Sequence, residues 1–347
     1  MSPAMSPVSK SRINWVDSVK GLTILLVVLQ HTTYGVAAAM PDMPGFFYAI
    51  CKWAEPFRMP LFFLVAGLFA QKALQTPLRS FLDGKILHFV YFYVLWTVIQ
   101  IGLKIALPHE GGAAVSLNDI AMAVVEPFGI LWFIYCLALF FGVMRLTRAV
   151  PPLAVFVVAL ALFLIRPHTG WMIPDEFAHR FIFFVSGVYF ARHVFTLASW
   201  AIAHARTAAA LSLTALTAIA ALVYGGLVQN HAVEIIASYS GAAAAIMLIA
   251  MLAARGLTAP LAYAGSRSLA IYLAFFIPMA LSRTVLIKLG LTDADLVTLI
   301  GFVFAVASTL IAHRIALATP FKFFYERPDF LKLKQADHAP RAAMSQA

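Results

Sequence analysis

The chain has 347 residues, of which 62% are hydrophobic and only 12% are charged. A soluble globular domain carries about 25% charged residues, so this composition excludes an ordinary soluble protein and favours a polytopic membrane protein. The formal net charge of +10 fits the excess of Lys and Arg on the cytoplasmic side of membrane proteins, and no nucleic-acid partner is expected.

Residues 1–14 are polar and are expected to form a disordered cytoplasmic tail. Ten apolar stretches then follow, each a candidate membrane span. They lie near residues 20–40, 57–74, 84–106, 124–146, 150–166, 177–195, 207–229, 233–254, 264–287 and 292–315. The predicted fold class is all-α, a polytopic membrane helical bundle of about ten transmembrane helices in one domain, 15–318. Residues 319–347 form a predicted basic and aromatic tail along the inner headgroups.

The distribution of charge predicts the orientation of these spans. With the N-terminus in the cytoplasm, 18 of the 25 Lys and Arg fall on the inner side. The other seven are Lys52, Arg58, Lys104, Arg166, Arg180, Arg283 and Lys288. This asymmetry favours an even number of spans, with both termini cytoplasmic.

The first apolar stretch contains a single imidazole, His31, eleven positions after Lys20. At 100° per residue these two side chains lie within about 20° of each other around a helix, and roughly 16 Å apart along its axis. Lys20 is therefore expected at one membrane surface and His31 near the middle. An ionisable side chain at that depth usually faces a bundle interior or a polar cavity, where it serves either catalysis or packing.

Two segments carry a resemblance to a known family. Asp17, Lys20, Gly21 and His31 match its opening pattern, and Phe57–Ala70 (FRMPLFFLVAGLFA) matches its Pro-Leu-Phe-Phe segment. The chain thus resembles the acyltransferase 3 family of membrane enzymes, which contains bacterial O-acetylases of surface polysaccharides. The resemblance extends over about residues 13–315.

The chain departs from this family pattern at several positions. Ala66 stands where the family usually has Ser, and Lys85 and His88 stand where two arginines usually lie three residues apart. Phe275 and Phe276 replace a His that commonly follows the segment GSRSLAIYL. These departures leave a catalytically inactive membrane partner as one open interpretation.

The resemblance implies an enzyme of the bacterial inner membrane that needs no cofactor and takes acyl-CoA as co-substrate. It would transfer an acyl group, most often acetyl, to a hydroxyl of a carbohydrate or envelope-linked acceptor. His31 would be the general base that takes the proton of the acceptor hydroxyl, and an acyl-His intermediate is the alternative.

Basic residues on the inner side are candidates for binding the donor. Lys20, Arg79 and Lys85 are suited to the phosphates of acyl-CoA, and Asp17 would position Lys20 three residues away. The competing interpretation for each cation is that its side chain snorkels to the headgroups and that its charge sets the orientation of the span.

Three further candidates are Arg58, expected near the outer surface at the start of the second span, and Glu126 and Trp132 at an apolar segment. Arg58 would bind substrate or stabilise a developing oxyanion, with interface anchoring as its alternative. Glu126 is a carboxylate that could orient His31, and Trp132 is either a substrate platform or a belt aromatic.

Other classes of site have less support. The sequence has no HExxH, no phosphate loop and no GxSxG, and its two cysteines, Cys51 and Cys136, make no metal-binding pattern. The alternative function is a proton-coupled transporter or flippase with His31 as relay. The predicted partners are the donor, the acceptor and membrane lipids. The sequence leaves the oligomeric state open.

Overall fold

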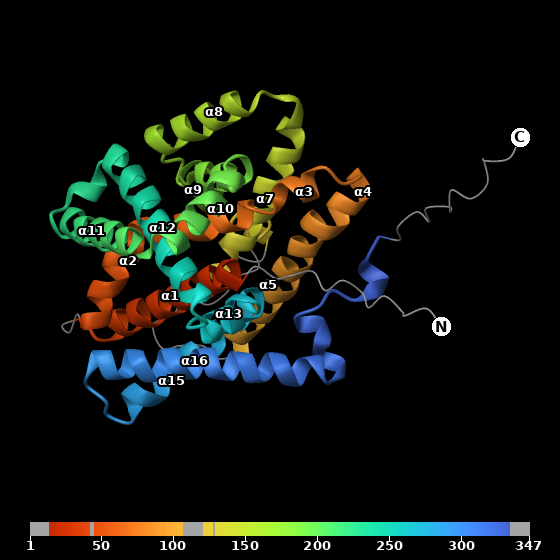
Figure 1. The fold of residues 1–347 in the computed structure, drawn as a ribbon. Helices are drawn as coiled ribbons and strands as arrows, with labels where there is room; N and C mark the ends of the chain where they lie inside the picture. Colours follow the sequence, from red (N-terminus) through yellow and green to blue (C-terminus); the bar gives the residue numbers. More distant parts are fainter. Residues whose placement is uncertain (1–13, 42–44, 107–120, 128, 334–347) are drawn as a thin grey trace, which may run out of the picture. The chain divides into compact units, whose positions relative to one another are not determined.

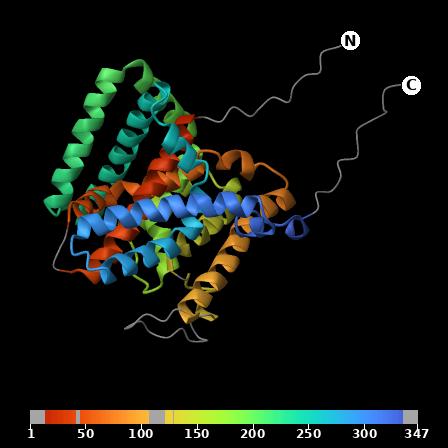
Figure 2. The same cartoon turned by 90° about the horizontal axis from the view of Figure 1, so that it is seen from below.

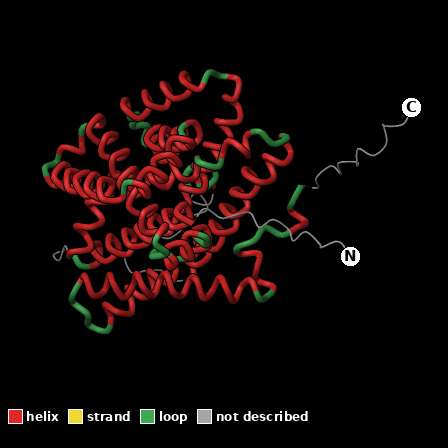
Figure 3. The backbone as a smooth tube through the Cα atoms, in the orientation of Figure 1, coloured by secondary structure: helices red, strands yellow, loops and turns green. Residues whose placement is uncertain are grey.

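The computed structural model describes residues 14–41, 45–106, 121–127 and 129–333. Every regular element within these ranges is a helix (Figure 3), in agreement with the predicted all-α class. The predicted N-terminal tail lies outside the described residues except for Asn14, which begins the first helix. The last part of the predicted C-terminal tail, from residue 334 on, also lies outside them.

Within its helical fold, the chain divides into two compact units. The larger contains Met1–Gln71 and Ala149–Ile315, and the smaller contains Lys72–Arg148 and Ala316–Ala347. Two helices run across the boundaries between the units, α3 (Ala70–Leu74) and α16 (Ala294–Leu317).

The other helices of the larger unit are labelled in Figure 1. They are α1 (Asn14–Ala39), α2 (Phe46–Gly67), α8 (Pro152–Ile165), α9 (Met172–Tyr189), α10 (Ala191–Ala203), α11 (Ala205–Tyr224), α12 (His231–Ala254), α13 (Ala259–Gly265), α14 (Ser268–Ala274) and α15 (Phe276–Lys288).

The smaller unit is built around two helices, α5 (His88–Ala106) and α7 (Trp132–Leu146), which pack on each other. A short α4 (Leu78–Phe81) and a π-helical turn (Leu82–Leu87) precede α5. The turns Gly129–Leu131, Pro320–Phe324 and Asp329–Leu331 are 3-10 helices.

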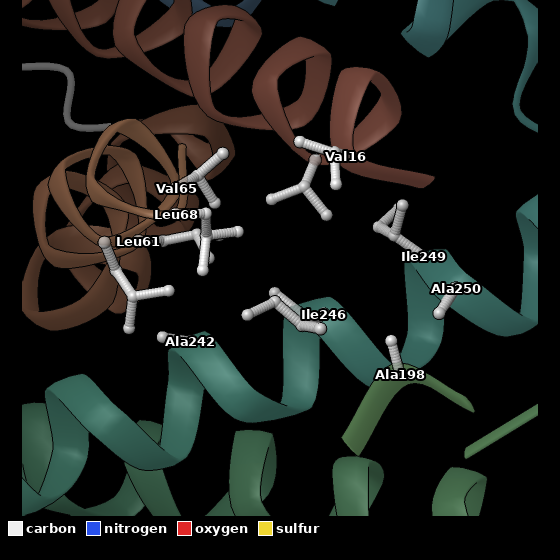
Figure 4. Packing of buried hydrophobic residues seen from close by; sticks show 12 residues of the cluster. Val16, Leu61, Val65, Leu68, Ala198, Ala242, Ile246, Ile249 and Ala250 are labelled. Carbon is white, nitrogen blue, oxygen red and sulfur yellow. The ribbon is translucent and has the colours of Figure 1, made fainter. Parts of the chain in front are cut away.

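The core of the larger unit lies where α1, α2 and α12 meet. Figure 4 shows Val16 of α1 across from Leu61 and Val65 of α2, with Ile246 of α12 below Val16 and Ile249 of α12 on its other side. Each helix contributes aliphatic side chains that are almost wholly buried. Helix association in a bilayer depends on van der Waals packing of this kind.

Glycines let helices of the larger unit approach closely. A Cβ atom at Gly21 would clash with the carbonyl oxygen of Leu261 in the α13 region, and one at Gly265 would clash with the carbonyl oxygen of Asp17. Close contact through small residues is typical of membrane helix pairs. Gly21 of the opening motif therefore has a packing role, which brings α1 against α13.

The small residues of α11 and α12 also have a packing role. These helices lie side by side (Figures 1 and 2). Ala237, Gly241 and Ala245 of α12 are buried.

The number of supported spans is smaller than the predicted ten. Among the described residues, six helices are long and apolar enough to cross a membrane, or eight if each of two bent pairs counts as one span. The two remaining stretches fall short for different reasons. α2 carries Lys52, Glu55 and Arg58 within 22 residues, and α8 has only 14 residues, where about 20 are needed.

Candidate functional site

Helix α2 is unusual because it contains two prolines, Pro56 and Pro60. Pro60 has no N–H to donate, so the carbonyl oxygen of Pro56, four residues earlier, loses its partner within the helix. The Ser238 hydroxyl of α12 donates a buried hydrogen bond of 2.6 Å to this oxygen. The bond fixes the part of α2 that lies between the two prolines, which contains Arg58.

Arg58 is buried, with only 4% of its surface exposed, and this burial carries the most information about the site. Neither its Nε nor its Nη1 atom has a hydrogen-bond partner among the described residues. Its charge acts on Cys51, Tyr34, Arg180 and Glu55, which are its electrostatic neighbours. A buried guanidinium without a paired anion is costly, so a ligand group that accepts hydrogen bonds would stabilise it.

His31 lies on α1 and is half-buried. Its ring is 5.5 Å from the ring of Phe275, at the break between α14 and α15, where the two helices differ in direction by 50°. Arg58 is the charged residue that acts on the His31 imidazole. Phe275, a position where the chain departs from the family pattern, is thus in direct contact with the predicted base.

Tyr34 is a residue that the sequence reasoning missed. It follows His31 by three residues on α1, and its hydroxyl is buried without a partner among the described residues. Arg58 and Glu55 act on this hydroxyl through their charges, while the Tyr34 ring packs 5.5 Å from that of Tyr48. The one available signal was its position one helical turn after His31, because residues three apart share a helix face.

We call His31, Tyr34 and Arg58 the α1–α2 polar cluster. Next to it, the Cys51 thiol of α2 donates to the Thr33 hydroxyl of α1 at 3.5 Å, which ties the two helices together. Among the described residues, the charged side chain that acts on the His31 imidazole is Arg58, and no carboxylate does so. Glu126, predicted to orient the imidazole, belongs to the smaller unit and is half-buried, so that role stays a prediction.

Lys20 and Asp17 form the ion pair expected from their spacing, with 3.8 Å between Nζ and Oδ1. The Lys20 ammonium also lies 5.7 Å from the centre of the Phe69 ring. Its side chain is 30% exposed. The structure therefore holds the Lys20 amine at a partly open position, and its donor role stays a prediction.

The other inner-side candidates belong to the smaller unit. Arg79 is exposed, and the Lys85 ammonium lies 4.8 Å from the Phe141 ring centre, a cation–π contact. Trp132 at the start of α7 is half-buried and packs edge-on against Phe133 at 6.3 Å. These contacts fit structural roles as well as substrate binding, and the site assignments remain predictions.

The smaller unit also contains a cavity of about 1000 Å³, lined in part by Asp83, Gly84 and His88 at the start of α5 and just before it. Its charged lining consists of Lys322, Arg327, Lys332, Asp83, Glu326 and Asp329, together with His88. Arg327 Nη2 pairs with Asp83 at 2.6 Å.

The hydrogen bond from Lys332 lowers the pKa of the Asp329 carboxyl, and burial raises the pKa of the Tyr325 hydroxyl. Because three cations face three carboxylates, this lining provides no net attraction for phosphate.

A second charged cluster in the larger unit also escaped prediction. Glu234 of α12 accepts from Arg166 Nη1 at 2.7 Å and lies 2.8 Å from His179 Nε2 of α9. Arg166 ends α8 in a left-handed conformation, with φ of 46°. A carboxylate and an imidazole within apolar helices were the available signals. Within the described residues, no group of three His, Cys, Asp or Glu side chains could hold a metal ion.

Comparison with known proteins agrees with this architecture. The chain is 22% identical over 212 residues to the inner membrane protein YcfT of Escherichia coli K12. That match covers 54% of the chain and 58% of YcfT, so the chain spans little more than half of that relative. No solved structure gives a significant match. The family model of acyltransferase 3, described as an acyltransferase domain, matches residues 13–314, and the chain therefore belongs to this family of membrane acyltransferases.

Proposed function

We propose that the protein is an O-acyltransferase of a bacterial inner membrane. It takes an acyl group, most commonly acetyl, from cytoplasmic acyl-CoA and transfers it to a hydroxyl of a carbohydrate or envelope-linked acceptor. The observation that carries this proposal is the buried Arg58, whose Nε and Nη1 atoms have no partner among the described residues and whose charge acts on His31. The inner-membrane location is supported by the name of the E. coli relative.

The reaction follows from the chemistry of these two side chains. The imidazole of His31 takes the proton of the acceptor hydroxyl as its oxygen attacks the thioester carbonyl. The carbonyl oxygen becomes negative, and the Arg58 guanidinium stabilises it. The C–S bond then breaks, an ester forms, and the thiolate of CoA leaves with the proton from His31.

Donor binding is proposed for the inner basic residues. In the larger unit, Lys20, positioned by Asp17, would bind a phosphate of acyl-CoA. Arg79 and Lys85 of the smaller unit are separate candidates for the same role. A proton-coupled transporter or flippase is the alternative. The two bent helix pairs, α9–α10 at 75° and α14–α15 at 50°, resemble the broken helices of transporters. Both breaks, however, lie in the second half of the chain, whereas inverted-repeat transporters break helices at matching places in the two halves.

The experiment is a measurement of CoA release by the purified protein. Acetyl-CoA is offered with a panel of sugar acceptors, to wild type and to His31→Ala. We expect acceptor-dependent release by wild type and a loss of at least about 10²-fold in the variant. Normal release by His31→Ala would refute the catalytic role, and acceptor binding without donor turnover would favour transport.

A further inference from the structure

Two residues of the α1–α2 polar cluster have buried polar atoms that make no hydrogen bond to the described residues. The Tyr34 hydroxyl and the Arg58 Nε and Nη1 atoms are buried, and no described residue bonds to them. Folded proteins satisfy nearly all of their buried polar atoms. Tyr34 follows Thr33, whose hydroxyl accepts from the Cys51 thiol of α2 at 3.5 Å, so the two groups come from helices that are bonded to each other here. Two such buried donors indicate a position kept for a ligand atom.

The neighbouring side chains do not supply that atom. The Thr33 hydroxyl already donates to the Leu29 carbonyl at 2.7 Å. Glu55 is held by Lys52, with 3.2 Å between Nζ and Oε2, and its side chain is 53% exposed. The Cys51 sulfur is a weak acceptor, and its thiol bonds to Thr33.

The types of the two groups restrict what the ligand atom is. A guanidinium has donors but no acceptor, and a phenol hydroxyl can donate one hydrogen bond. A group that both of them bind is therefore an acceptor, and a carbonyl oxygen, which becomes negative as the hydroxyl oxygen attacks, fits two donors best. The acceptor hydroxyl is left to the imidazole of His31, one helical turn before Tyr34.

We propose that Tyr34 is a second catalytic residue, whose hydroxyl binds the carbonyl oxygen of the transferred acyl group together with Arg58. The inference rests on the proposed function and extends it. Tyr34 stays protonated throughout and donates a hydrogen bond that shortens as the oxygen becomes negative. The proton still moves from the acceptor hydroxyl to His31 and on to the CoA thiolate, so the balance of the reaction is unchanged.

The test is the Tyr34→Phe variant, which removes only the hydroxyl. We expect kcat to fall by about 10²-fold, the typical effect of removing one donor to an oxyanion. The KM for the donor should stay within about twofold, because the bond strengthens only in the transition state. Tyr48→Phe is the matched control, since its ring contacts that of Tyr34, and it should keep wild-type kcat.

A second measurement separates this role from a structural one. The Tyr34 hydroxyl has no partner among the described residues, so its removal should leave Tm unchanged or raise it. A lower Tm for Tyr34→Phe would show that the hydroxyl is bonded within the protein and would overturn the proposal. Wild-type kcat in Tyr34→Phe would overturn it as well. If His31→Ala is inactive while Tyr34→Phe is normal, the role of Tyr34 fails and the proposed function stands.

Discussion

The ring of Phe275 lies 5.5 Å from the imidazole of His31, where α14 ends and α15 begins. An apolar aromatic ring therefore packs against the predicted base, at the position where the family pattern commonly has a His. Phe275 is completely buried, so it fills space that a smaller side chain would leave empty.

Phe275→Ala should destabilise the protein by about 3 kcal/mol, because a buried aromatic ring is replaced by a cavity. Activity should fall with it, since the imidazole loses the ring that restricts its position. Phe276→Ala is the control, since that side chain is 40% exposed, and it should unfold like wild type. Equal stability of the two variants, measured by thermal or denaturant unfolding, would contradict the packing role.

Arg58→Met should separate stability from activity. Replacing an unpaired buried charge by an apolar side chain of similar length removes a desolvation cost, so we expect a gain of about 1 kcal/mol in unfolding free energy. The rate of CoA release should fall by about 10²- to 10³-fold. A destabilised Arg58→Met protein would mean that the guanidinium has a structural partner.

Arg283→Met provides the contrast for this measurement. Arg283 donates to the Gly35 carbonyl at 3.1 Å, so its removal should cost about 1 kcal/mol of stability. We expect the unfolding free energy to rise in Arg58→Met and to fall in Arg283→Met.

Ser238→Ala should destabilise the protein by about 1 to 3 kcal/mol, because it leaves the Pro56 carbonyl unsatisfied in a buried position. Ser212→Ala is the matched control, since the Ser212 hydroxyl is buried and no residue in the described part of the chain bonds to it. That variant should be as stable as wild type or more so. Chemical unfolding of both variants in detergent measures the difference, and equal losses would show that the Ser238 bond adds nothing.

Glu234→Gln should weaken the contacts among α8, α9 and α12, since one carboxylate meets both Arg166 and His179. Its side chain is 12% exposed, and a loss of about 2 kcal/mol is expected, below the full cost of breaking a deeply buried pair. Asp329→Asn should leave unfolding unchanged, because Asp329 is 94% exposed beside Lys332. A neutral Glu234→Gln would contradict a structural role for this cluster.

The sequence predicted the helical class well, because apolar stretches of bilayer length have few alternatives to a helix in lipid. The count of ten spans is not confirmed at α2 and α8. Hydropathy averages over a window, whereas α2 contains two prolines and three charged residues and α8 has only 14 residues. The division into two units depends on contacts between distant segments, which no local pattern records.

The site was predicted in part. His31 stood out because it is an ionisable side chain within an apolar segment, whereas Arg58 was predicted near the outer surface at the start of the second span. In the structure Arg58 is buried and its charge acts on His31, and the roles of both residues stay predictions. Tyr34 did not stand out, since a tyrosine near a membrane surface is usually a belt aromatic. Its missing hydrogen-bond partner becomes visible only after α1 and α2 are packed together.

The central claim is that His31 and Arg58 act as one unit on the transferred acyl group. The most direct test is the rate of CoA release by wild type, His31→Ala, Arg58→Met and the double variant. Residues that act together in catalysis show non-additive losses, so the double variant should lose no more than about threefold beyond the worse single variant. Losses that multiply, or normal release by His31→Ala, would contradict the claim.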